Sequence, residues 1–317
     1  MMMLLLCLLA LSTARAHIDV VPAGIFDQGE PIPSDGFRVT ALGTGTPGVS
    51  KSALATGFLI QLGNGDNFIF DLGTGSYINL FATGVHQDTL TKVFLSHLHS
   101  DHIADLASLY IGASFGRKRP WEVWGPSGPV PSQGTKAVIE GLKQFLSWDQ
   151  VARRKIDLVG RSDDGDKVIA HEFDYTIPNQ LIYSRNGVNI TSTPVQHYLT
   201  GGPSALRLDW NGLSITYSGD TKPTHTLIDL AKLGHGTDLL LLQVCGPVLD
   251  FDALNYEGRF MLNTSHITPT QAGPIISAIR PRLATAHHLT VNDASRVAII
   301  SDIRTGYPEG CTQFGPA

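Results

Sequence analysis

Residues 97–102, with the sequence His-Leu-His-Ser-Asp-His, contain three imidazoles and a carboxylate within six positions. They follow the apolar run Val93–Leu95, which predicts a strand. Side chains alternate along an extended backbone, so His97 and His99 point to the same side, and a turn brings the carboxylate and the third imidazole beside them. Neutral imidazole and carboxylate groups are the ligands that suit Zn²⁺ and similar divalent ions. The cluster therefore predicts a metal site.

Further polar residues lie where predicted strands end. His197, Asp220 and the adjacent pair His287 and His288 each come after a run of strand-forming residues. A single histidine at a strand end is more often a hydrogen-bonded structural residue than a ligand. Together with residues 97–102, however, these side chains follow the ends of several predicted strands, and a sheet can bring such strand ends together at one edge.

The remaining pattern is one of strands in hairpins followed by strands mixed with helices, in each half of the chain. The turn Gly63–Asp66 is a strong hairpin signal. Strands are predicted at 37–42, 56–62, 67–71, 90–95, 121–124, 187–195, 205–210, 213–217, 239–244 and 283–286. Helices are predicted at 103–115, 136–148, 226–233, 268–279 and 293–304. The fourth helix has Thr268 as its N-cap, and Pro274 should kink or shorten it. The order of elements favours two sheets covered by helices on their outer faces.

The chain of 317 residues is 42% hydrophobic and 16% charged, with a formal net charge of -5. This composition is typical of a globular protein, and the charge provides no global attraction to nucleic acid or to an anionic membrane.

Residues 1–16 resemble a secretory signal peptide, because Leu4–Leu11 is almost wholly apolar and Ala14-Arg-Ala16 fits a cleavage site. No Lys or Arg precedes this run, so a buried N-terminal helix is the alternative; the run is too short to span a bilayer. We expect a secreted or periplasmic protein with an extended arm over 17–36 and one domain over 37–317. Cys7 would leave with the signal peptide, while Cys245 and Cys311 form either a disulfide or two buried thiols.

These motifs resemble the metallo-β-lactamase fold superfamily, most closely its branch of arylsulfatases and tRNA 3′-processing endonucleases (tRNase Z). The resemblance runs from residue 37 to about residue 302. It rests on the segments Leu42–Pro47, Phe70–Gly75, Ser96–His102, Tyr217–Thr221 and Ser265–Gly273. It implies an α/β fold, a four-layer αββα sandwich, and a hydrolase domain over 37–317.

The resemblance also implies two metal ions per chain. The ligands would be His97, His99 and His197 for one ion and Asp101, His102 and His288 for the other, with Asp220 bridging both. Asp71 would orient a ligand histidine. His288 is favoured over His287 by its distance from Pro281. Zinc is the default, and Mn²⁺ or Fe²⁺ could occupy the same ligands.

His266 matches a histidine that the family uses near the scissile bond. We expect it to donate a proton to the leaving group, so Asp101 and His266 are the predicted catalytic residues. The alternative for His266 is a hydrogen bond to the helix that starts at Thr268. Asp220 stands where the antibiotic-hydrolysing members carry Cys or lack a bridging ligand, which argues against β-lactamase activity.

The charge of such a site suits an anionic ester. Two divalent ions, two carboxylates and a shared hydroxide leave about one net positive charge. We therefore expect a secreted dinuclear zinc hydrolase, in which the shared hydroxide attacks a phosphodiester or aryl sulfate ester. The expected partner is a small anionic ester; nucleic acid is not expected, and a homodimer is left open.

Three other functions remain as alternatives. A tRNase Z-like RNA endonuclease fits the motifs, but the signal peptide, the acidic charge and the lack of a long Gly/basic arm argue against it. A lactonase or other acyl hydrolase of the same superfamily is a further enzymatic alternative. A metal-free binding protein on this scaffold is the non-enzymatic one.

Overall fold

The computed structural model describes residues 18–22, 30–48, 53–112, 117–156, 164–198, 201–246, 255–289 and 293–306. The chain divides into two compact units, each containing one sheet. The N-terminal unit comprises residues 19–176 and 200–202, and the C-terminal unit comprises residues 1–18, 177–199 and 203–317. The predicted signal peptide, residues 1–16, lies outside the described residues.

The N-terminal unit contains a seven-stranded mixed sheet in the order β1-β2-β3-β4-β5-β6-β7. Strands β2 to β4 form an antiparallel meander, and β4 to β7 are parallel. The predicted hairpin joins β3 to β4, where Asp66 N–H donates to Asn64 Oδ1 at 2.9 Å and Gly65 has a φ of 89°. The strands are β1 (Ile18–Pro22), β2 (Phe37–Gly43), β3 (Gly57–Leu62), β4 (Asn67–Leu72), β5 (Lys92–Phe94), β6 (Trp121–Pro126) and β7 (Val168–Phe173).

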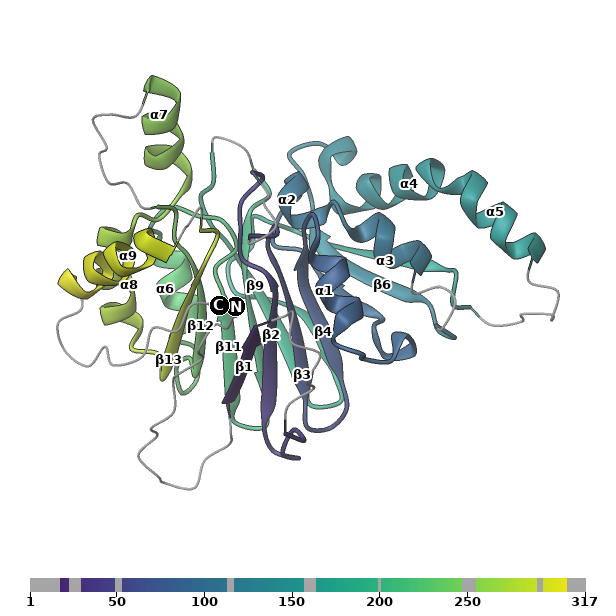
Figure 1. Cartoon of the computed structure of the whole chain (residues 1–317), viewed down its shortest axis with the longest axis horizontal. Helices are drawn as coiled ribbons and strands as arrows, with labels where there is room; N and C mark the ends of the chain where they lie inside the picture. Colours follow the sequence, from purple (N-terminus) through teal and green to yellow (C-terminus); the bar gives the residue numbers. More distant parts are fainter. Residues whose placement is uncertain are drawn as a thin grey trace. The chain divides into compact units, whose positions relative to one another are not determined.

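Helices α1, α3 and α4 cover one face of this sheet (Figure 1). Their apolar residues Leu80, Leu109 and Ile139 share one buried core with the strand residues Leu59 and Ile69. This core fixes the strand ends that carry the predicted ligands. The helices of the unit are α1 (Ser76–Ala82), η1 (Gln87–Thr89), α2 (Ser100–Ile103), α3 (Leu106–Gly112), η3 (Pro131–Gln133), α4 (Thr135–Phe145) and α5 (Ser147–Ile156).

The C-terminal unit contains a six-stranded mixed sheet in the order β13-β12-β11-β10-β9-β8. Strands β9 and β11 are both antiparallel to β10, and β12 and β13 are parallel to β11. Strands β9, β11, β12 and β13 therefore run in one direction, and their carboxyl ends lie at one edge. The strands are β8 (Gln180–Arg185), β9 (Val188–Pro194), β10 (Ser204–Trp210), β11 (Leu213–Tyr217), β12 (Leu239–Gln243) and β13 (Leu283–His287).

Helices α6, α8 and α9 cover one face of the second sheet, and Figure 1 shows α8 and α9 side by side next to β13. Leu230, Ile276 and Ile303 from these helices pack with Leu240 and Ala284 from the strands. Helix α7 leads into the segment before α8 (Figure 1). The helices are α6 (His225–Ala231), α7 (Tyr256–Ser265), α8 (Pro269–Ile279) and α9 (Asp293–Thr305).

Several predicted elements differ from the observed ones. The predicted helix 103–115 begins at the last residue of α2 and includes all of α3, and its residues 113–115 lie outside the described ranges. The prediction at 136–148 covers parts of α4 and α5. Strand β1 occupies part of the predicted extended arm, and α1, α7, β7 and β8 were not predicted. Helix α8 runs through Pro274 to Ile279, because its buried apolar face holds it against the sheet. The expectation that Pro274 shortens this helix is therefore wrong.

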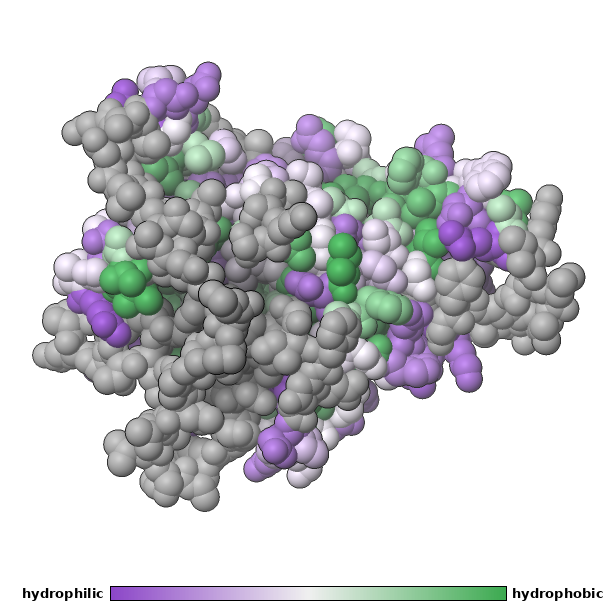
Figure 2. Space-filling model, viewed as in Figure 1, coloured by the Kyte–Doolittle hydropathy of each residue, from purple (hydrophilic) through white to green (hydrophobic). Residues whose placement is uncertain are grey.

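Polar and apolar side chains are interspersed on the visible face of the N-terminal unit, with apolar side chains around α4 (Figure 2). The most exposed large apolar residues of α4 and α5 are Phe145 and Trp148, at 77% and 80% exposure. Within the described ranges, every helix is too short or too polar to cross a membrane.

Candidate metal centre

Asp71 is the centre of the hydrogen-bond network in the N-terminal unit. It lies at a β-bulge, since the strand register shifts between Phe70, which pairs with Phe58, and Leu72, which pairs with Gly57. Its φ is 55°, in the left-handed region, and its side chain is fully buried. The carboxylate accepts hydrogen bonds from the backbone N–H of Ser96, at 2.7 Å, and from the Ser96 hydroxyl, at 2.6 Å. The bulge therefore directs the carboxylate toward the loop that follows β5.

The same carboxylate fixes the tautomer of His102. The Nδ1 atom of His102 lies 2.7 Å from Asp71 Oδ2, so Nδ1 carries a proton, and in the neutral ring Nε2 keeps the lone pair. This bare Nε2 faces the Oδ2 atom of Asp101 at 3.4 Å. Two hydrogen-bond acceptors therefore face one another, an arrangement that a shared cation stabilises.

Ser96 fixes the tautomer of His97 in a similar way. Its hydroxyl donates to Asp71, so the oxygen accepts from His97 Nδ1, 3.0 Å away. The Nε2 atom of His97 is thereby left with a lone pair and lies 3.1 Å from Nδ1 of His99. His97 and His99 lie side by side as expected, but in the loop after β5, which ends at Phe94, and Asp101 and His102 lie on helix α2.

Gly73 lets helix α2 approach β4. A Cβ atom at this position would lie 1.8 Å from the carbonyl oxygen of Asp101 and 2.8 Å from the Cβ of Ala55. Only a residue without a side chain fits, so Gly73 sets the position of the helix that carries Asp101 and His102.

A second group of site residues lies at the carboxyl edge of the C-terminal sheet. His197 follows β9 and Asp220 follows β11, and both are buried. The Nδ1 atom of His197 lies 2.9 Å from the carbonyl oxygen of Ser265. A carbonyl only accepts, so Nδ1 carries a proton; in the neutral ring the lone pair is on Nε2, which faces Asp220 Oδ2 at 3.8 Å. The arrangement at His102 is thus repeated in the second unit.

The two adjacent histidines after β13 point in different directions. The Nε2 atom of His288 lies 2.9 Å from Asp220 Oδ2, whereas the ring of His287 lies 5.1 Å from the ring of Tyr217. The structure therefore brings His288, and not His287, to Asp220. His288 has a φ of 63°, which turns its side chain away from the strand direction.

His266 lies in the short segment between α7 and α8. Its ring stacks on that of His288 at 4.9 Å and contacts the ring of His197 edge-on at 5.0 Å. The predicted proton donor therefore lies among the predicted ligands of its own unit. The predicted cap of α8 is also present, because Thr268 N–H donates to the side chain of Gln271 at 3.0 Å.

Gln243 links two of these segments, and its role was not predicted. Its Oε1 atom accepts from the backbone N–H of Thr221, at 3.4 Å, and of Ile267, at 3.2 Å. These residues directly follow Asp220 and His266. The buried amide at the end of β12 therefore ties together the two loops that carry them. From the sequence, Gln243 was placed only within the predicted strand 239–244, without a role.

The donor set fits divalent cations in each unit. In the N-terminal unit, the rings of His97 and His102 lie 4.1 Å apart, and Asp101 Oδ2 lies 3.4 Å from His102 Nε2. In the C-terminal unit, one ligand atom each from His197, Asp220 and His266 lie within 4.8 Å of one another. The bare imidazole nitrogens and carboxylate oxygens described above are the ligand types for such ions.

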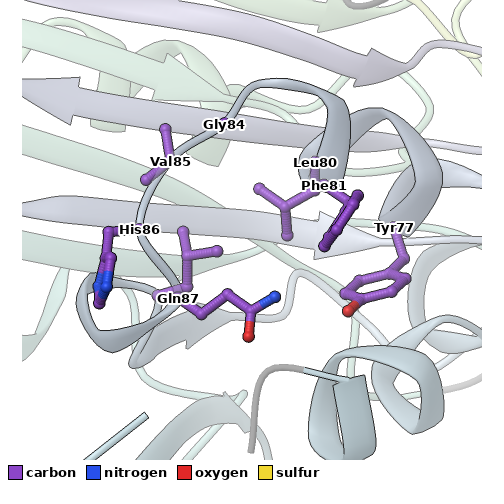
Figure 3. Close-up of a pocket in the computed structure, with 8 residues that line it drawn as sticks. Tyr77, Leu80, Phe81, Gly84, Val85, His86 and Gln87 are labelled. Carbon is purple, nitrogen blue, oxygen red and sulfur yellow. The ribbon is translucent and has the colours of Figure 1, made fainter. Parts of the chain in front are cut away.

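A surface pocket of about 410 Å³ lies elsewhere in the N-terminal unit. In Figure 3 the rings of Tyr77 and Phe81 on α1 face the segment that carries Val85, His86 and Gln87. No predicted site residue lines this pocket.

Residues 66–289 match the family described as the beta-lactamase superfamily domain. The chain belongs to this family. The family membership confirms the resemblance that the motifs indicated, and with it the prediction of a metal-dependent hydrolase.

Solved structures agree on the fold. The metallo-beta-lactamase fold protein YhfI from Bacillus subtilis superposes with a TM-score of 0.62 at 19% identity, over 86% of this chain and 94% of YhfI. The short form of human tRNase Z gives a TM-score of 0.60 at 20% identity, over 79% of this chain and 92% of that protein. The predicted fold class, the α/β metallo-beta-lactamase sandwich, is confirmed by these likenesses.

Curated relatives are named Ribonuclease Z. The protein from Mycolicibacterium gilvum (strain PYR-GCK) is 29% identical over 207 residues, covering 62% of this chain and 65% of the relative. That from Mycobacterium avium (strain 104) is 30% identical over 204 residues, covering 62% of this chain and 66% of the relative. The matches thus span just under two thirds of these relatives' length.

These names correct two predictions. The main functional prediction, a secreted phosphodiesterase or aryl sulfatase for small esters, is wrong, because the relatives favour the tRNase Z-like alternative. They also argue against the expectation that nucleic acid is not a partner. That expectation relied on the predicted signal peptide, on the lack of a long Gly/basic arm and on the formal net charge of -5. The net charge averages over the whole chain and does not describe the local field at a site.

Proposed function

We propose that this chain is a metal-dependent endoribonuclease that hydrolyses phosphodiester bonds, with precursor tRNA as the substrate to test first. The observation that carries the proposal is the repeated arrangement in which a bare imidazole nitrogen faces a carboxylate oxygen, at His102 with Asp101 and at His197 with Asp220. The Ribonuclease Z relatives support RNA as the substrate.

We assign the ligands as the sequence resemblance implies. One ion would be held by His97, His99 and His197, the other by Asp101, His102 and His288, with Asp220 shared. Zinc is proposed for both positions, and Mn²⁺ or Fe²⁺ are the alternatives that metal analysis distinguishes. When bound, such ions lower the pKa of a water and neutralise charge on the phosphoryl oxygens.

The chain's own residues hold the ligands in one protonation state. Asp71 and the carbonyl of Ser265 keep protons on the Nδ1 atoms of His102 and His197, so both Nε2 atoms stay available as ligands. His266 is proposed to donate a proton to the leaving oxygen. Its position between α7 and α8 keeps its ring against His197 and His288.

A substrate panel tests the proposal. Purified protein is supplied with zinc and offered a precursor tRNA with a 3′ extension, an aryl sulfate and a lactone. We expect cleavage of the RNA, loss of that cleavage in His99→Ala, and no comparable turnover of the sulfate or the lactone. Turnover of the lactone or the sulfate without RNA cleavage would reject the proposal. The matched control is His225→Ala, which removes an exposed histidine of α6.

A further inference from the structure

Cys245 lies directly beside two of the proposed site histidines in the C-terminal unit. It is a free, buried thiol. Its Sγ atom and one ring nitrogen each of His266 and His288 all lie within 4.8 Å of one another. Cys311, the other half of the disulfide considered from the sequence, lies outside the described residues.

Backbone hydrogen bonds on either side fix the position of this thiol. The N–H of Val244 donates to the carbonyl of His287 at 2.9 Å, next to His288. The N–H of Cys245 donates to the carbonyl of Ile267 at 2.8 Å, next to His266. These two main-chain hydrogen bonds therefore hold the residue that carries the sulfur between the two histidine-bearing segments.

One sulfur and two imidazole nitrogens form a ligand set for thiophilic divalent ions. Zinc binds thiolate at about 2.3 Å and imidazole at about 2.0–2.1 Å, so two ligand atoms on one ion can lie at most about 4.4 Å apart, close to the 4.8 Å within which these three atoms lie. The sulfur makes this set softer than the imidazole and carboxylate ligands proposed for catalysis.

We infer that Cys245, His266 and His288 form a second, inhibitory metal site that takes a thiophilic ion such as Zn²⁺ in excess or Cd²⁺. The thiol binds as a thiolate and releases its proton to solvent. An ion bound there occupies His288, the proposed ligand of a catalytic ion, and His266, the proposed proton donor. Occupation therefore inhibits hydrolysis.

Binding is tested directly by titrating the full-length protein with Cd²⁺ and recording the ultraviolet thiolate-to-metal charge-transfer absorption. We expect a saturable band in the wild type that is lost in Cys245→Ser and retained in His225→Ala. A wild type without such a band, or a Cys245→Ser variant with the same band, would overturn the inference.

Cys7 and Cys311 are also thiols, so peptide mapping after alkylation supplies a readout that needs no variant. Cd²⁺ should protect the peptide that contains Cys245 from iodoacetamide. Alkylation of that peptide at an unchanged rate would count against the site even if Cys245→Ser failed to fold.

Inhibition is measured as a second arm. Excess Cd²⁺ should inhibit hydrolysis by the wild type. Half-inhibition of Cys245→Ser should need a Cd²⁺ concentration higher by more than about 10–100-fold, because that factor is the usual cost of losing a residue that only orients a ligand, and Cys245 is itself the proposed ligand. Equal sensitivity of the two proteins would contradict the inhibitory role. The charge-transfer band does not depend on turnover, so an inactive protein with a Cys245-dependent band would reject the proposed function and leave this site standing.

Discussion

The substitution Asp71→Asn tests whether Asp71 sets the tautomer of His102, a proposed metal ligand. Asp71 accepts hydrogen bonds from Ser96 N–H, from the Ser96 hydroxyl and from His102 Nδ1, at 2.7, 2.6 and 2.7 Å. Asparagine keeps the shape and one acceptor oxygen, which still accepts from the Ser96 N–H. Its amide nitrogen replaces Oδ2, so the Ser96 hydroxyl rotates to accept.

His102, unlike the Ser96 hydroxyl, cannot change from donor to acceptor at Nδ1 by a rotation. Its Nδ1 can accept from the new amide only if the proton moves to Nε2, and Nε2 then loses the lone pair that faces Asp101. We expect metal affinity to fall about 10–100-fold, the range for loss of a partner that orients a ligand. The loss of a hydrogen bond to a buried charge should reduce the free energy of unfolding by about 1.5–3 kcal/mol.

The assay is zinc competition against a chromogenic chelator, with thermal unfolding measured in parallel. Asp238→Asn is the matched control, because Asp238 is also buried and accepts from Arg282, His235 and the Ser214 N–H at 3.0, 3.1 and 2.9 Å. It should lose stability without losing metal affinity. The reasoning is refuted if Asp71→Asn binds zinc as tightly as the wild type, or if the control loses metal to the same extent.

Three further predictions follow from close contacts and charges. Gly73→Ala places a methyl group 1.8 Å from the carbonyl oxygen of Asp101, so α2 must move. Because α2 carries Asp101 and His102, we expect kcat to fall about 10²-fold, and an unchanged kcat would contradict this prediction. Gln243→Met removes the acceptor for two backbone N–H groups and should lower kcat about 10–100-fold at normal metal content, while Gln243→Glu, which keeps an oxygen there, should retain more activity. Burial alone would raise the pKa of Asp238, but hydrogen bonds from Arg282, His235 and Ser214 and the charge of Arg282 lower it below 3.8. The wild type should therefore exceed Asp238→Asn in free energy of unfolding by the largest amount at neutral pH, and this difference should decrease as the pH falls through that lowered pKa. A difference that increases on acidification would contradict the prediction.

The sequence predicted the parts of the site that have strong local signals. The spacing of residues 97–102 after an apolar strand pointed to the histidine cluster, and polar residues at strand ends pointed to His197, Asp220 and the pair His287 and His288. The family resemblance then favoured His288 over His287. The structure places each of these at the carboxyl end of the strand from which it was predicted, because strands that run in one direction end at one edge.

The hydrogen-bond partners of these ligands could not be predicted in the same way. The acceptor for His197 is a backbone carbonyl, at Ser265, and any residue type supplies that group. The bulge at Asp71 depends on pairing with a different strand. Helix α7 has no strong apolar period, so its sequence provided little signal. Strands β7 and β8 have partly exposed, mixed patterns, which weakened their alternation.

Cleavage of precursor tRNA by the full-length protein, before and after metal removal, tests the central claim most directly. We expect a chelator to abolish cleavage and stoichiometric zinc, about two ions per chain, to restore it. RNA cleavage that persists in the chelated, metal-free protein would contradict the account, as would a zinc-loaded protein that leaves the RNA intact.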